Sequence, residues 1–186
     1  MKRLIMTIML VCNFKALCAQ ETRTNGFYIG NSKIIPEVFQ DNEGGDVWGI
    51  SMVGVTDKSK INGHRSKNNL PLEKTLTLFV DKKTVTLDSS EKFFSDFQSP
   101  DDFVLVKLNS DRKDNIRWIK TANGSTRKNF QFMINKNDML DFEWVKMDNG
   151  FYKINPSIDL GHYAFIFNGK SSYSNNQIFT FTCCFQ

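Results

Sequence analysis

Cysteine is scarce in the part of the chain where a fold stabilised by disulfide bonds would need it. The sequence of 186 residues has four cysteines, and only Cys183 and Cys184 lie beyond the first twenty residues. Adjacent cysteines are poorly placed to form a disulfide with each other without strain, and that part of the chain offers no other partner. The sequence therefore excludes a small scaffold held together by disulfide bonds.

Long apolar segments are also lacking. The apolar run of residues 4–11 is too short to span a bilayer as a stable anchor. It follows Lys2 and Arg3 and precedes Ala19, a small residue at the position expected for cleavage. Residues 1–19 are therefore predicted to be a signal peptide that is removed from the mature protein.

The features of a lipoprotein signal are missing from the same segment. Such a signal has a small residue directly before the cysteine that is acylated, but here Val11 precedes Cys12 and Leu17 precedes Cys18. We therefore expect export to the periplasm or the extracellular space without a lipid anchor. We expect no transmembrane segment in the mature chain.

A large positive charge is lacking once the signal peptide is removed. The full sequence has 24 basic and 20 acidic residues, which gives a formal net charge of +4. Three of the basic residues and none of the acidic ones lie in residues 1–19, so 21 basic and 20 acidic residues remain, a charge of +1. A nucleic-acid partner is therefore not expected.

Recognisable catalytic and metal-binding motifs are absent. The two histidines, His64 and His162, do not have metal-site spacing. The acidic turn of residues 41–46 lacks the alternating oxygen ligands and the distal glutamate of an EF-hand calcium loop. The sequence predicts no cofactor, no metal and no catalytic residue. A hydrolase is the least favoured class, and it is unsupported rather than excluded because glycosidase carboxylates cannot be recognised from spacing alone.

Phenylalanine is abundant, with 17 copies against four prolines, and aromatic residues favour half-buried strands. Short segments of alternating polarity recur between turn signals. They are residues 47–55, 75–80, 84–87, 103–108, 116–121, 130–134, 140–144 and 151–154. About ten short strands with little helix predict an all-β fold, an antiparallel β-sandwich of the immunoglobulin-like or a related type.

Turn signals predict how these strands are connected. Asp81-Lys82-Lys83 is expected to close a hairpin, Ser99-Pro100-Asp101-Asp102 to precede the strand at Phe103, and Asn149-Gly150 to close a second hairpin. The chain is long enough to bury its own core. Residues 20–186 are therefore predicted to form a single domain, with an alternative sub-boundary near residue 90.

Several motifs in the second half of the chain form a pattern. They are Ser99 to Leu108, Arg117, Gly150 to Pro156, Leu160 to Phe165, and Ile178 to Phe181. Through these motifs, residues 93–186 resemble a family of uncharacterised bacterial β-sandwich modules, and the resemblance implies the same fold without catalytic residues. Family members usually have proline and glutamate where this chain has Leu160 and His162.

His162, Cys183 and Cys184 have two interpretations. A catalytic cysteine–histidine pair needs a thiolate that is stabilised by the imidazolium. The cysteines lie in an apolar strand, where burial raises the pKa of a thiol. We therefore expect Gly161 to provide a turn, His162 to face solvent, and one cysteine to fill core space while the other faces outward.

Charge is distributed unevenly along the chain. Residues 36–57 contain five acidic and no basic residues, whereas residues 107–128 contain seven basic and two acidic residues. The basic stretch includes Arg117 and Trp118, which are candidates for binding an anionic glycan or an acidic surface. The favoured alternative places these charges on the wet faces of strands, some paired with the acidic segment, and Trp118 in the core.

An exposed tryptophan would suit a protein that binds sugars, and Trp48 is the third candidate because it follows the acidic turn. Trp144 alternates with core residues and is expected to be buried.

We expect an exported, non-enzymatic β-sandwich protein that serves as an interaction or accessory module, with a cell-envelope protein or a glycan as its partner. A carbohydrate-binding module is the alternative.

Overall fold

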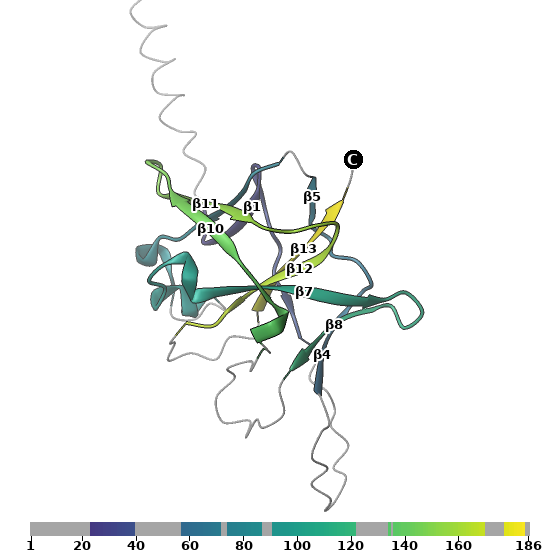
Figure 1. The fold of residues 1–186 in the computed structure, drawn as a ribbon. Coiled ribbons are helices and arrows are strands. Elements are labelled where there is room, and N and C mark those ends of the chain that lie inside the picture. The colour runs from purple at the N-terminus through teal and green to yellow at the C-terminus, as the bar shows by residue number, and fades with distance from the viewer. Residues whose placement is uncertain are drawn as a thin grey trace, which may run out of the picture.

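The computed structural model describes residues 23–39, 57–71, 74–86, 91–121, 134, 136–169 and 177–184 (Figure 1). These residues form thirteen β-strands, four short 3-10 helices and no α-helix. The predicted all-β fold with little helix is confirmed for this part of the chain. Several predicted features lie outside the described residues: the signal peptide, the acidic turn, the strand that contains Trp48, and most of the strand of residues 130–134.

The strands belong to two sheets. The smaller sheet has the order β10-β11-β6-β1-β2, with β1 (Gly26–Ile29), β2 (Ser32–Lys33), β6 (Leu76–Phe79), β10 (Phe142–Lys146) and β11 (Phe151–Pro156). The larger sheet has the order β3-β13-β12-β7-β8-β4, with β3 (Glu37–Val38), β4 (Asp57–Asn62), β7 (Phe103–Asp111), β8 (Ile116–Thr121), β12 (Gly161–Phe167) and β13 (Gln177–Cys184). Two further strands join it: β5 (Asn69–Pro71) is parallel to β13, and β9 (Met139–Leu140) is antiparallel to β7.

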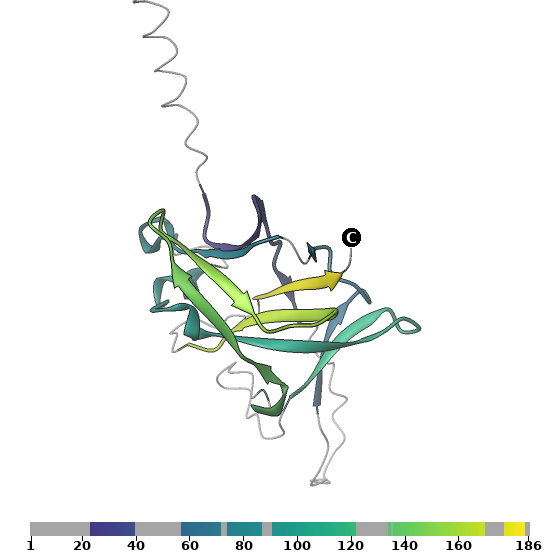
Figure 2. The same ribbon diagram turned by 45° about the horizontal axis from the view of Figure 1, so that its top comes forward.

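Aromatic side chains fill the space between the two sheets. The ring of Phe27 on β1 stacks on the ring of Phe165 on β12, with centroids 4.4 Å apart. The 3-10 helix Lys92–Ser95 adds the buried rings of Phe93 and Phe94. Figure 2 shows the β10–β11 hairpin crossing β7 and β12 at a steep angle. Burial of each phenylalanine side chain contributes about 1.5–3 kcal/mol to the free energy of folding. Many of the phenylalanines of the sequence belong to this aromatic core.

A second apolar cluster lies on the other face of the larger sheet. In β12, Tyr163 and Phe165 belong to the aromatic core, whereas Ala164 and Ile166 belong to the second cluster with residues of β4, β7, β8 and β13. One face of β12 packs in the aromatic core between the two sheets. Its other face is also buried, because the larger sheet curls into a nearly closed, barrel-like form. A strand that is buried on both faces needs successive apolar residues, which residues 163–167 provide.

The hairpin predicted at Asn149-Gly150 is confirmed. It joins β10 to β11, and Gly150 adopts a φ of +82°, a left-handed conformation that glycine reaches without a steric penalty. The backbone N–H of Met147 donates to the carbonyl oxygen of Phe151 at 2.7 Å and closes the turn. The predicted glycine turn at Gly161 also agrees with the structure, since β12 begins there with a φ of +155°.

The turn predicted before the strand at Phe103 is also present. Ser99 and Asp102 form a capping box around the 3-10 helix Pro100–Asp102. β7 begins at the next residue, Phe103. The strand predicted for residues 116–121 is confirmed as β8, which has the same bounds.

The hairpin predicted at Asp81-Lys82-Lys83 is wrong. Lys82–Thr84 form a 3-10 helix, and residues 85 and 86 are not in a strand. The carboxylate of Asp81 accepts the backbone N–H of Lys83 at 3.0 Å, which stabilises the helical turn. The buried Asn25 side chain accepts the backbone N–H of Asp81 at 2.6 Å, and the strand before this turn pairs with β1 and β11.

Candidate functional site

Arg117, a predicted binding residue, is inside the protein. Its side chain has 0% relative exposure, so the expectation that it lies on a wet face is wrong. Its Nε donates to the carbonyl oxygen of Gly63 at 2.8 Å, and its Nη2 donates to the carbonyl oxygen of Asn62 at 3.2 Å. Nη2 also forms an ion pair with the Glu37 carboxylate at 2.5 Å. The expected pairing between the basic stretch and the acidic segment is therefore confirmed at this residue.

The pair between Arg117 and Glu37 connects strands that are not neighbours in the sheet. Arg117 lies on β8, next to one end of the larger sheet, and Glu37 lies on β3 at the other end. The ion pair therefore links the two ends across the curl of the sheet. The buried Nη1 of Arg117 has no hydrogen-bond partner among the described residues.

A polar network attaches β5 and the segment before it to β13. The hydroxyl of Ser66 is hydrogen-bonded to the carbonyl oxygen of Thr180 at 3.0 Å, and the Nδ2 of Asn68 donates to the same oxygen at 2.9 Å. The backbone N–H of Thr182 donates to the carbonyl oxygen of Asn68 at 2.8 Å. Ser66, Thr180 and Thr182 are buried, so these hydrogen bonds satisfy groups that water does not reach.

His162 takes part in the same polar region. Its Nδ1 is hydrogen-bonded to the Oγ1 of Thr182 at 2.9 Å, and the residue is half-buried, so the expectation that it faces solvent is wrong. Burial lowers the pKa of His162 below its ordinary value of 6.5, and the positive charges of Arg117 and Arg65 and the nearby His64 lower it further. The imidazole is therefore neutral at pH 7.

One cysteine, Cys183, fills core space as the sequence predicts. Cys183 is buried in the aromatic core, and Cys184 is half-buried. Burial raises the pKa of the Cys183 thiol, and Cys184 and Asp159 raise it further. Cys183 and Thr182 are consecutive strand residues, so Cys183 lies on the face of β13 opposite to Thr182 and His162. His162 is therefore not the base of a Cys183 nucleophile.

The two other predicted binding residues do not complete a site with Arg117. Trp118 is half-buried on β8 and belongs to neither apolar cluster of the described residues, so the expectation that it lies in the core is wrong. Trp48 lies outside the described residues. Trp144 packs against the aromatic core as expected, and its Nε1 donates to the Asp101 carboxylate at 2.9 Å.

The described residues contain no group of three or more His, Cys, Asp or Glu side chains that is placed to hold a metal ion. No helix formed by these residues is long and apolar enough to cross a membrane.

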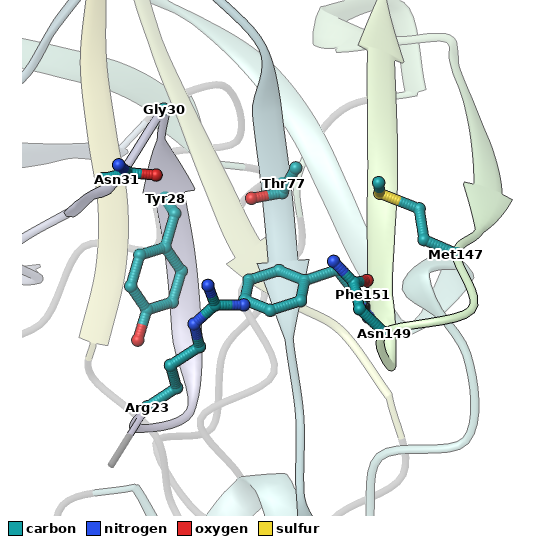
Figure 3. Close-up of a pocket in the computed structure, with 8 residues that line it drawn as sticks. All are labelled: Arg23, Tyr28, Gly30, Asn31, Thr77, Met147, Asn149 and Phe151. Atoms are coloured by element: carbon teal, nitrogen blue, oxygen red, sulfur yellow. Dashed lines mark hydrogen bonds between the residues drawn. The ribbon is translucent and has the colours of Figure 1, made fainter. Parts of the chain in front are cut away.

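A pocket lies on the outer face of the smaller sheet, and neither Arg117 nor Trp118 lines it (Figure 3). Its volume is about 200 Å³. Tyr28 comes from β1, Thr77 from β6, and Phe151 from the start of β11. The remaining lining residues are Arg23, Gly30, Asn31, Met147 and Asn149.

Strand register explains why these side chains converge. Tyr28 is directly opposite Thr77, and Phe151 is directly opposite Phe79, so these four residues lie on one face of the sheet. The neighbouring residues Leu76 and Leu78 face the aromatic core instead. The pocket therefore occupies the side of the smaller sheet that is turned away from the larger sheet.

Arg23 provides the positive charge of the pocket. Its guanidinium lies over the ring of Phe151, 4.6 Å from the ring centroid, and Figure 3 shows it between the rings of Tyr28 and Phe151. The hydroxyl of Tyr28 donates to the carbonyl oxygen of Thr24 at 2.6 Å, which holds the segment after Arg23 against the sheet. The lining contains one cation and no acidic residue.

Sequence reasoning missed this pocket because its residues come from three distant segments. The one local signal is Phe151, an aromatic residue that directly follows the Asn149-Gly150 turn and alternates with the inward-facing Tyr152. The partners Tyr28 and Thr77 become neighbours only through the strand order β11-β6-β1.

No protein-family model, curated protein or solved structure matches this chain.

Proposed function

We propose that this protein is an exported, non-enzymatic binding module of the cell envelope, and that its ligand occupies the pocket on the outer face of the smaller sheet. The observation that carries the binding role is the pocket itself, which brings an exposed cation, two aromatic rings and three polar side chains together. Export is inferred from the signal-peptide pattern of residues 1–19.

Binding is favoured over catalysis because three of the side chains with reactive chemistry have structural positions. His162 is hydrogen-bonded to Thr182, and Arg117 is paired with Glu37 inside the larger sheet. Cys183 is buried in the aromatic core with a raised pKa, so its thiol is protonated at neutral pH. None of these three side chains lines the pocket.

We assign the fold to the immunoglobulin-like or a related class of β-sandwich, within the family of bacterial modules that residues 93–186 resemble. The contact between Phe27 and Phe165 supports this assignment, because it joins the two sheets face to face. The turn residues Ser99 and Gly150 of the resemblance pattern also occupy structural positions, which agrees with a pattern that specifies the fold.

The binding role is tested by retention of cell-envelope material on the immobilised protein. Thr77→Trp places a large ring in the pocket, whereas Ser110→Trp places the same ring at an exposed position of β7. We expect the wild-type protein and Ser110→Trp to retain the same component, and Thr77→Trp to lose it. Equal retention by all three proteins, each checked for native circular dichroism, would contradict the proposal.

A carbohydrate-binding module is the second candidate, and the aromatic side chains of the pocket favour it. Tyr28 and Phe151 provide apolar surface, and Asn31, Asn149 and Thr77 provide hydrogen-bonding groups next to it. A pyranose ring has the matching arrangement of apolar C–H faces and polar hydroxyl edges. A glycan-array screen without a hit would remove this candidate while leaving a protein partner open.

A further inference from the structure

We propose that the pocket binds a carboxylated sugar residue of an acidic glycan, with Arg23 as the group that recognises the carboxylate. This inference rests on the proposed binding role of the pocket and adds the chemical class of the ligand. It is carried by the charge of Arg23, by the chemistry of the lining, by the pocket volume and by the positive residues on the same face.

The charge of Arg23 is available to a ligand. The two ion pairs between described residues are Lys33–Glu91 and Arg117–Glu37, and neither involves Arg23. The side chain lies over the face of Phe151, which restrains the guanidinium plane through a cation–π contact. The planar guanidinium presents parallel N–H groups that match the two oxygens of a carboxylate.

The walls of the pocket suit a single sugar ring that enters edge-on. Tyr28 and Phe151 are only 8% and 6% exposed, so their rings border the pocket and do not form an open platform. Met147 adds a flexible apolar wall from the β10–β11 hairpin (Figure 3). The Oδ1 of Asn149 accepts the backbone N–H of Phe151 at 3.2 Å, which fixes this carboxamide and leaves its NH₂ group as a donor for a hydroxyl.

The size of the pocket sets the size of the group it holds. Its volume of about 200 Å³ is below the range of about 300–1,000 Å³ that is typical of sites for drug-sized ligands. The pocket therefore holds one ring of a larger molecule, and the rest of the ligand lies over the sheet surface outside it.

Positive residues flank the pocket on this surface. Lys153 on β11 is directly opposite Thr77, and Lys33 on β2 is directly opposite Tyr28, so the four residues form a row across four strands. Lys153 is exposed, whereas Lys33 is bonded to Glu91. A chain of acidic sugars that leaves the pocket along this row meets Lys153, which favours an acidic glycan over a neutral one.

Calorimetric titration with three probes tests the ligand class. The probes are digalacturonate, which has sugar rings and carboxylates; galactobiose, which has the rings alone; and succinate, which has carboxylates alone. We expect digalacturonate to bind the purified protein at least about tenfold more tightly than either of the others, because a charge-assisted hydrogen bond contributes at least that factor. Equal affinity for galactobiose or for succinate would overturn the proposal.

Substitutions locate the site. Arg23→Gln removes the charge with little change in length and should weaken digalacturonate binding at least about tenfold, whereas Arg23→Lys should retain part of the affinity. Lys153→Gln removes a cation from the same face outside the pocket and should weaken binding less than about threefold. An unchanged affinity of Arg23→Gln, with its unfolding midpoint also unchanged, would overturn the assignment to Arg23.

The experiment separates failure of the ligand class from failure of the binding role. Envelope material that is retained by the wild-type protein, lost by Thr77→Trp and not displaced by digalacturonate would contradict the acidic-sugar ligand and uphold the pocket. An absence of both digalacturonate binding and pocket-dependent retention would contradict the two proposals together.

Discussion

Arg117 on β8 and Glu37 on β3 form an ion pair across the curl of the larger sheet, although their strands are not neighbours. The arginine side chain is fully buried, and the glutamate side chain is 17% exposed. The other described ion pair, Lys33–Glu91, has both side chains 29% exposed, so solvent screens it more strongly. The two pairs therefore make different contributions to stability.

Removing Glu37 should strongly destabilise the protein. Glu37→Ala leaves the charge of Arg117 buried without a counter-ion, and breaking a buried pair in this way costs about 3–5 kcal/mol. Because Glu37 is partly exposed, we expect the lower end of this range, measured as a fall in the free energy of unfolding in urea. The matched variant Glu91→Ala, at the more exposed pair, should cost less than about 1 kcal/mol.

Replacing both partners should restore part of the loss. The double variant Glu37→Ala with Arg117→Met removes the unpaired buried charge and should be more stable than Glu37→Ala alone. A double variant that is less stable than Glu37→Ala would show that the hydrogen bonds from Arg117 to Gly63 and Asn62 stabilise the fold by more than the unpaired buried charge costs.

Stability should depend on the protonation of His162. Its pKa in the folded protein is below 6.5, so at mildly acidic pH the unfolded chain binds more protons than the folded one. The stability that folding gains by holding His162 in its neutral form is fully present above pH 6.5. It is lost as the pH falls from 6.5 towards the lower pKa of His162 in the folded protein. His162→Asn cannot titrate, so the stability difference between the wild-type protein and this variant should move against the wild type between pH 7 and pH 5.

Paired urea unfolding curves at several pH values measure that difference and cancel the titration of carboxylates common to both proteins. A histidine C–H resonance, assigned by its loss in His162→Asn, reports the folded pKa directly. A midpoint above pH 6.5 would contradict the role of burial and of the Arg117 charge.

The parts of the fold that follow a local pattern were predictable from the sequence. The alternation in β10 and the Asn149-Gly150 turn specify a hairpin without help from the rest of the chain. β12 departs from alternation because both of its faces are buried, and an apolar run alone does not say how the sheet curls. The local sequence of the 3-10 helix at Lys82–Thr84 resembles a hairpin turn. The hydrogen bond from the backbone of Asp81 to the distant Asn25 could not be predicted from that local sequence.

The residues of the candidate sites were less predictable because they depend on pairing between distant strands. Arg117 belongs to a basic stretch that a sequence pattern places on a wet face, but the fold buries it next to Glu37, which is 80 residues away. Arg23, Tyr28 and Phe151 meet only after β1, β6 and β11 have paired. The sequence shows which charged and aromatic residues are present, but the pairing register of the strands decides which of these residues share a surface.

Cys183 should resist modification in the folded protein. In a chain without residues 1–19 and with Cys184→Ser, Cys183 is the one remaining thiol. Its burial and raised pKa predict little reaction with iodoacetamide at pH 7 and rapid reaction in urea. The reciprocal variant Cys183→Ser should lose about 1–3 kcal/mol of stability, because it buries a hydroxyl in an apolar core. Fast labelling of native Cys183 would contradict its place in the core.

The contact between Phe27 and Phe165 should be among the strongest links between the two sheets. Phe27 is 1% exposed, and its ring also lies 5.0 Å from Phe103 and 5.1 Å from Phe179, so Phe27→Ala opens a cavity that several rings border. We expect a loss of about 3–5 kcal/mol in the free energy of unfolding. Val145→Ala, at an exposed position of β10, is the control and should cost less than about 0.5 kcal/mol. A similar small loss for both variants would mean that the smaller sheet does not depend on this aromatic contact for its packing against β12.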